Sequence, residues 1–270
     1  VLERQRDPHC VRLQHSFRAQ GCLSTLNVAV QSGDWLATRQ ALKADPAHID
    51  WQPTQRASDL LPAIRRSAER MAVDPSLRAA ASAASLPAQV AREALHALGQ
   101  QQWLCALREG PWGSAALNAH IEAVLRQAWR VDGAGDWFGG RAVIVHQNDY
   151  ELGLFNGDIG ICVREADGRL GVWFAGAAEK APRRFAPLDL PHCESAFAIS
   201  IHKSQGSEYP HVHVVLPPDP EHRILSRQLL YTALSRARHS IHLYASDAVL
   251  EASLQRRISR VGGLQARLAG

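Results

Sequence analysis

The sequence has few lysines, few aromatic residues and no paired cysteine motif. Lys43, Lys180 and Lys203 are its only lysines, so arginine supplies most of the positive charge, and the net charge is +4. The five cysteines form no C-x-x-C pair, which argues against a disulfide framework or a metal site and favours a reducing, cytoplasmic compartment. Because no apolar run reaches membrane-spanning length and no signal peptide leads the chain, we expect no membrane partner.

Two parts of the machinery for phosphoryl transfer are also missing. No G-x-x-x-x-G-K-[ST] phosphate loop occurs among the 270 residues, and no Asp-Glu pair follows an apolar strand in the manner of magnesium-holding carboxylates. The chain does not start with methionine, and residues 1–4 resemble the interior of a longer sequence. We therefore expect a fragment that does not hydrolyse ATP by itself.

Hydrophobic residues make up 46% of the chain and charged residues 21%, which is enough apolar material for one large or two modest domains. The small positive net charge is compatible with nucleic-acid binding but is weak support for it. Helices are predicted at residues 23–30, 35–44, 58–100 with breaks at 74–75 and 86–87, 114–129, 226–237 and from 247 onward. Strands are predicted at residues 103–107, 141–145, 159–164, 170–174, 183–185, 196–199, 212–216 and 239–244.

The most informative segment is the polar loop of residues 200–209, which lies between two apolar runs. It offers hydroxyl, imidazole, ammonium, amide and carboxylate groups within a few residues. Loops at the ends of buried parallel strands are where α/β proteins bind ligands, and this set of groups suits phosphate and ribose. An ordinary polar turn is the alternative, but the density of hydrogen-bond donors disfavours it.

Two further segments present arginines. In residues 229–238, Thr232 and Arg236 lie four apart on one helix face, and a fixed guanidinium at the helix end suits an arginine finger on a γ-phosphate. An arginine that caps a helix C-terminus explains the same pattern, and by itself this segment favours that simpler explanation. In residues 13–18, a strand end is followed by Arg18, which is a weak signal alone.

Taken together and in this order, the segments resemble the second motor lobe of superfamily 1 helicases. Residues 200–209 are similar to motif V, residues 229–238 to motif VI and residues 13–18 to motif IV. Residues 104–118 and 140–160 are similar to the RecD family, the alpha subunits of exodeoxyribonuclease V (RecBCD). The resemblance covers nearly the whole chain and is weakest at about 45–100.

The resemblance implies a role for each matching residue. Arg236 is then the arginine finger, and Arg18 is a second contact to the γ-phosphate. The nucleotide-binding residues are then Gln205, Gly206 and Glu208, and the residues that contact single-stranded DNA are Ser200, His202, Lys203 and Ser204. The cofactor is ATP with Mg²⁺, whose ligands belong to an N-terminal motor lobe. Ser200 replaces the usual Thr and keeps the hydroxyl, whereas Gln228 replaces a common Glu.

The implied fold is a RecA-like α/β lobe, with a parallel sheet flanked by helices and a small inserted SH3-like β-barrel. The expected domains are residues 1–140 and 196–270 for the lobe and residues 141–195 for the insert. The implied function is 5′-to-3′ DNA unwinding in double-strand-break repair, with RecB- and RecC-like partners. A stand-alone RecD-like helicase, a conjugative relaxase-helicase and a non-catalytic DNA-binding or scaffold module remain open alternatives.

Overall fold

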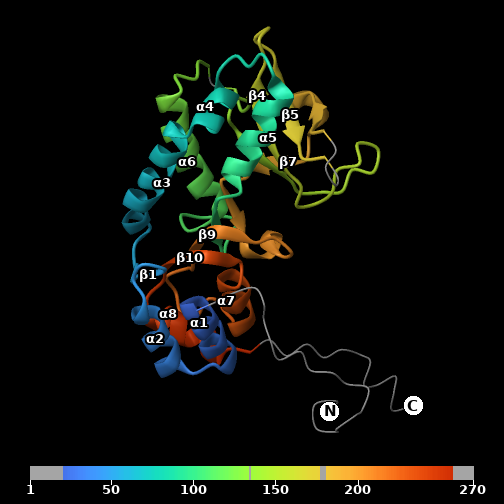
Figure 1. The fold of residues 1–270 in the computed structure, drawn as a ribbon. Coiled ribbons are helices and arrows are strands. Elements are labelled where there is room, and N and C mark those ends of the chain that lie inside the picture. The colour runs from blue at the N-terminus through green and yellow to red at the C-terminus, as the bar shows by residue number, and fades with distance from the viewer. Residues whose placement is uncertain (1–20, 134, 177–180, 258–270) are drawn as a thin grey trace, which may run out of the picture.

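The computed structural model describes residues 21–133, 135–176 and 181–257. Two five-stranded sheets organise these residues and lie at different levels of the molecule (Figure 1). The first sheet is parallel, in the order β1-β10-β9-β2-β8, and the second is antiparallel, in the order β6-β5-β4-β3-β7. In the described part of the chain, no helix is both long and apolar enough to cross a membrane.

The parallel sheet is covered by helices on both sides. Its strands are β1 (Ile49–Gln52), β2 (Gln101–Cys105), β8 (Ala198–Ser200), β9 (Tyr209–Val215) and β10 (Ala237–Tyr244). Val212, Val214 and Ile241 are fully buried, as expected of a parallel sheet that is enclosed on both faces. Figure 1 shows α1, α2, α7 and α8 on one side of this sheet and α3, α5 and α6 on the other. The predicted α/β class is confirmed.

Apart from α1, the described helices begin where Asp, Ser or Pro marks the sequence. They are α1 (Gly21–Ser32), α2 (Trp35–Ala44), α3 (Leu61–Val73), α4 (Pro75–Ala81), α5 (Pro87–Leu98), α6 (Ser114–Ala128), α7 (Arg227–Leu234) and α8 (Asp247–Gln255), with short 3-10 turns at Ala57–Leu60, Pro187–Asp189 and Ile201–Ser204. The Asp74 carboxylate accepts from the backbone N of Ser76 at 2.9 Å and of Leu77 at 3.0 Å, and so starts α4. The predicted breaks at residues 74–75 and 86–87 are confirmed.

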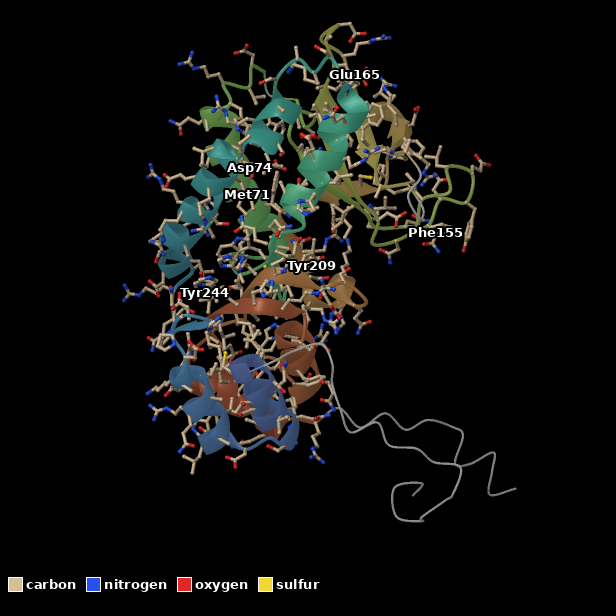
Figure 2. All side chains as sticks on the ribbon, in the orientation of Figure 1. Met71, Asp74, Phe155, Glu165, Tyr209 and Tyr244 are labelled. Atoms are coloured by element: carbon tan, nitrogen blue, oxygen red, sulfur yellow. The ribbon has the colours of Figure 1, made fainter. Side chains whose placement is uncertain are left out.

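The second sheet has its own small core. Its strands are β3 (Ala142–Val145), β4 (Ile159–Arg164), β5 (Leu170–Phe174), β6 (Arg183–Phe185) and β7 (Cys193–Ser195), all within the predicted insert. Gly168, at a φ of +84°, forms the predicted turn between β4 and β5. Figure 2 shows Phe155 and Glu165 on this side of the molecule, away from Tyr244 in the parallel sheet. Among the described residues β6 and β7 are the two ends of the sheet order and do not pair, so an SH3-like barrel stays a prediction.

Some element bounds differ from the predictions. The strand β1 was not predicted; it is a short edge strand of mixed polarity that pairs with β10. The helix α7 ends earlier than predicted, because the chain leaves the helix at Ser235 to enter β10 at Ala237. Pairing with a neighbouring strand, which the local sequence does not encode, decides both cases.

Asn118 of α6 ties the helix to the junction of the two sheets. Its amide nitrogen donates to the carbonyl of Ser195 at 2.9 Å and to that of Ala198 at 2.8 Å, and its oxygen accepts from the Ala198 N–H at 2.7 Å. Its side chain is almost fully buried. Because one amide serves both the end of β7 and the start of β8, it fixes where the second sheet joins the first.

Replacing this amide should destabilise the fold. We expect Asn118→Ala to lower the free energy of unfolding by about 2–3 kcal/mol, because it leaves buried backbone groups without partners. Urea denaturation followed by circular dichroism measures the loss. The exposed Gln55→Ala is the control and should stay within about 0.5 kcal/mol of wild type. An Asn118→Ala variant as stable as this control would contradict the bridging role.

A column of stacked rings crosses the parallel sheet. The His213 ring lies 4.2 Å from that of Trp103 and 4.5 Å from that of His242, measured between centroids. Trp103 Nε1 donates to the Ser67 hydroxyl at 3.0 Å, which anchors the column to α3. Burial lowers the pKa of His213 well below its usual value, so this imidazole is neutral in the folded protein.

The column should make stability depend on pH. The unfolded chain binds a proton at His213 below pH of about 6.5, whereas the folded chain does not, so stability falls as the pH drops below that value. We expect His213 to contribute a slope of up to about 1.4 kcal/mol per pH unit, and His213→Gln to remove that contribution. Urea titrations between pH 5 and 8 measure it, with the exposed His120→Gln as the control. An unchanged slope in His213→Gln would refute the assignment.

Candidate nucleotide and nucleic-acid interface

The loop between β8 and β9 runs from one edge of the parallel sheet to the other. Ser200 is in register with Cys105, the last residue of β2, whereas His211 is in register with Gln101, the first. Since β8 and β9 run in the same direction, the eight residues between them must return across the sheet. The loop therefore has one end at the carboxyl edge of the sheet and the other at the amino edge.

The first half of the loop is a 3-10 turn. Ser200 caps it, and its hydroxyl accepts from the Lys203 N–H at 3.4 Å. His202 is exposed and Lys203 is half-buried. Ser204 is buried and its hydroxyl donates to the carbonyl of Ile201 at 2.7 Å, so it supports the turn and does not face solvent. The turn brings together three of the four predicted DNA contacts on accessible surface.

The second half of the loop is bound to the segment that follows α7. Arg236 is only 7% exposed as a whole residue, and its Nη1 donates to the carbonyl of Ser207 at 3.0 Å. Its Nε donates to the carbonyl of Thr232 at 3.0 Å, and its Nη2 to the Ser235 hydroxyl at 3.1 Å. In return the Tyr209 N–H donates to the carbonyl of Arg236 at 2.9 Å. The predicted arginine finger is therefore a fixed group attached to the loop.

The predicted nucleotide-binding residues lie beside this attachment. Glu208 pairs with Arg238 at 2.9 Å, which adds a second link between the loop and the start of β10. Gln205 and Gly206 are exposed. Gly206 has a φ of +92°, a conformation that other residues rarely adopt, and it leaves the backbone open to an approaching ligand. Arg18 lies outside the described residues, so its position relative to Arg236 stays a prediction.

The structure adds two residues that the sequence analysis did not single out. Glu194 of β7 forms an ion pair with Lys203 and accepts from Arg108 Nη2 at 3.0 Å. Arg108 follows β2, the strand next to β8. Glu194 lies nine residues before Lys203 and 86 residues after Arg108, and no recognisable motif links the three. The pairing of β7 with β3 fixes Glu194 in position.

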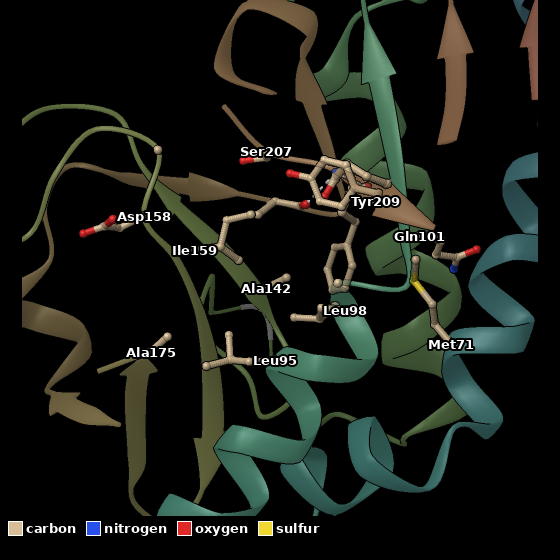
Figure 3. Close-up of a pocket in the computed structure, with 15 residues that line it drawn as sticks. Met71, Leu95, Leu98, Gln101, Ala142, Asp158, Ile159, Ala175, Ser207 and Tyr209 are labelled. Carbon is tan, nitrogen blue, oxygen red and sulfur yellow. Dashed lines mark hydrogen bonds between the residues drawn. The ribbon is translucent and has the colours of Figure 1, made fainter. Parts of the chain in front are cut away.

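A mostly apolar cleft of about 320 Å³ lies near the amino edge of the parallel sheet (Figure 3). In this view Ser207 and Tyr209 lie along its upper side, and Leu95 and Ala175 along its lower side. Neither Lys nor Arg is among the described residues that line it. Because it lacks cationic side chains, the cleft does not have the chemistry of a phosphate site.

Two histidines of β9, His211 and His213, contact neighbouring side chains. His213 is stacked and buried, and His211 Nδ1 lies 2.8 Å from the Ser240 hydroxyl. Among the described residues, Cys22, Asp45 and His48 have potential metal-ligand atoms within 4.8 Å of one another. His48 pairs with Asp45 at 2.9 Å near the end of α2. We assign no metal to this group.

The fixed position of Arg236 should contribute to stability without any nucleotide. We expect Arg236→Ala to lower the free energy of unfolding by about 2–4 kcal/mol, because buried carbonyl and hydroxyl partners lose a charged donor. The neighbouring, half-exposed Arg238→Ala is the control and should cost about 1 kcal/mol or less. Chemical denaturation measures both. Equal losses in the two variants would contradict the buried geometry.

Comparisons with known proteins agree with the motifs. Residues 195–244, which contain the loop and Arg236, match the UvrD-like helicase C-terminal domain. The RecBCD enzyme subunit RecD of Mycolicibacterium smegmatis is 34% identical over 95% of this chain, and the match spans 43% of that protein. The ATP-dependent RecD2 DNA helicase of Deinococcus radiodurans is 33% identical over 52% of this chain and 19% of its own length.

Solved helicase structures also align over most of the chain. The Pif1 helicase from Bacteroides, in complex with ADP-AlF3 and ssDNA, covers 96% of this chain and 56% of its own at 16% identity and a TM-score of 0.40. This likeness is too low to locate ligands on the present chain. The sequence matches, by contrast, confirm the resemblance that the motifs predicted: the chain is similar to RecD over nearly its whole length, and residues 195–244 match the UvrD-like helicase C-terminal domain.

Proposed function

We propose that the chain is the second motor lobe of an ATP-dependent 5′-to-3′ DNA helicase of the RecD type, which acts in double-strand-break repair. One observation supports this most strongly: a single loop carries Lys203 at one end and is bonded to Arg236 at the other. A motor needs such an element, because nucleotide state must alter the grip on DNA. The chain spans less than half of the RecD subunit it matches, so the activity belongs to the longer protein.

The nucleotide end of the loop has the chemistry for a γ-phosphate. Arg236 is held by hydrogen bonds from Nε, Nη1 and Nη2, and a guanidinium that is already fixed loses little conformational freedom when it stabilises transition-state charge. The same half of the loop carries Gln205, Gly206 and Glu208. The proposed γ-phosphate contact of Arg18 rests on the resemblance alone. Mg²⁺ enters with ATP as part of the substrate, and its ligands and the phosphate loop belong to the other motor lobe.

The DNA end of the loop has the chemistry for a sugar-phosphate backbone. Ser200, His202 and Lys203 offer a hydroxyl, an imidazole and an ammonium on one turn. Such groups contact phosphate and sugar and carry no base sequence information. RecB- and RecC-like partners and a cytoplasmic location follow from the resemblance and are part of the proposal.

A stand-alone RecD-like helicase is the second candidate, because the Deinococcus radiodurans helicase matches half of the chain. It shares every residue role above and differs in its partners. A relaxase-helicase differs by a Tyr- and His-rich domain upstream. A non-catalytic DNA-binding module differs by the absence of a phosphate loop from the full-length protein.

Binding and hydrolysis measurements test the proposal. We expect the purified chain to bind labelled oligo-dT and to hydrolyse no ATP. We expect Lys203→Gln to weaken binding about eightfold at 50 mM salt. One lost phosphate contact to single-stranded DNA reduces the slope of the logarithm of the binding constant against the logarithm of the salt concentration by about 0.7. Lys43→Gln, an exposed lysine on α2, is the matched control and should bind like wild type. ATP hydrolysis by the chain, abolished by Arg236→Ala, would contradict the assignment, as would equal binding by Lys203→Gln and Lys43→Gln.

A further inference from the structure

A cluster of charges joins the two sheets at the carboxyl edge of the parallel sheet. Glu194 of β7 binds Lys203, which follows β8, and Arg108, which follows β2. Because β2 and β8 are parallel neighbours, the residues after them emerge at the same edge. Two segments far apart in sequence therefore present their cations side by side.

The two cations share a single carboxylate. The side chain of Lys203 is 20% exposed and that of Glu194 is 26% exposed, whereas the side chain of Arg108 is 64% exposed. Glu109 also approaches Arg108, with Oε1 at 3.5 Å from Nε, but its side chain is 77% exposed and its effect is screened by water. Arg108 is thus the outermost member of the cluster and is open to an anion.

A cleft of about 330 Å³ lies beside the cluster, with Arg108 and Glu194 among the residues that line it. Deeper in this cleft Arg141 pairs with Glu122 at 3.4 Å, and their side chains are only 13% and 18% exposed. This inner pair is already compensated, so the accessible positive charge lies at the rim. A polyanion that follows the edge of the sheet meets Arg108 and Lys203 first.

We propose that Arg108 is a further backbone contact for single-stranded DNA, and that it binds phosphate together with Lys203. The inference rests on the proposed function, since it extends the DNA-binding turn onto the loop after β2. A guanidinium forms two parallel hydrogen bonds to phosphate, and an ammonium adds a point charge. Glu194 orients both groups before DNA arrives and is a positioning residue.

Salt-dependent binding of fluorescent oligo-dT and oligo-dA to the 270-residue chain tests this inference. We expect Arg108→Gln to weaken binding about eightfold at 50 mM salt and about threefold at 200 mM salt, because the slope falls by about 0.7 for one lost phosphate contact. The loss should be equal for both oligonucleotides, because the backbone is shared. Arg169→Gln is the matched control: this arginine is exposed on the hairpin between β4 and β5 and pairs with Asp167.

The variants separate the two proposals. If Lys203→Gln weakens binding and Arg108→Gln behaves like Arg169→Gln, the role of Arg108 is overturned and the proposed function stands. If the wild-type chain does not bind either oligonucleotide, or no variant weakens binding, both are overturned. A loss confined to one base sequence would overturn the phosphate contact. Thermal unfolding of each variant checks that the fold is retained.

Discussion

The hydrogen bond from the buried Arg236 guanidinium to the carbonyl of Ser207 is the interaction on which the arrangement of the site depends. It binds the loop to the end of α7, and the Tyr209 N–H returns a bond to the carbonyl of Arg236. A charged group this deeply buried is costly unless its donors are satisfied, so the loop and the helix end must keep one relative position. A change at Arg236 is therefore transmitted to the backbone of the loop.

The junction of the two sheets fixes the position of the other end of the loop, at residues 200–203. Asn118 holds the end of β7 against the start of β8, and β7 carries the carboxylate that binds Lys203. Through Glu194 the second sheet thus contributes to the edge that we propose to face DNA. Since neighbouring parallel strands end at this edge, Arg108 joins the same surface without being close in sequence.

The sequence predicted most of the fold and part of the site. Pro75 and Pro87 marked helix starts, Gly168 marked a turn, and apolar runs marked the buried strands, because each of these signals is local. The loop and Arg236 were found from their motif order. Glu194 and Arg108 were missed because neither residue belongs to a recognisable motif, and Arg108 comes near Lys203 only because β2 pairs with β8. Ser204 was predicted as a DNA contact, but its hydroxyl faces inward; nothing in a polar loop indicates which hydroxyl caps its own turn.

The central claim is that the loop between β8 and β9 connects the proposed DNA contacts with the proposed nucleotide contacts. Amide hydrogen exchange of the chain, measured with and without oligo-dT, tests this claim most directly. If the loop acts as one unit, DNA should slow exchange at residues 201–203 and also at Ser207, Tyr209 and Arg236, which DNA is not expected to touch. The backbone bond between Tyr209 and Arg236 provides the reporter for the distant end. Slower exchange confined to residues 201–203, with the distant amides unchanged, would contradict the account.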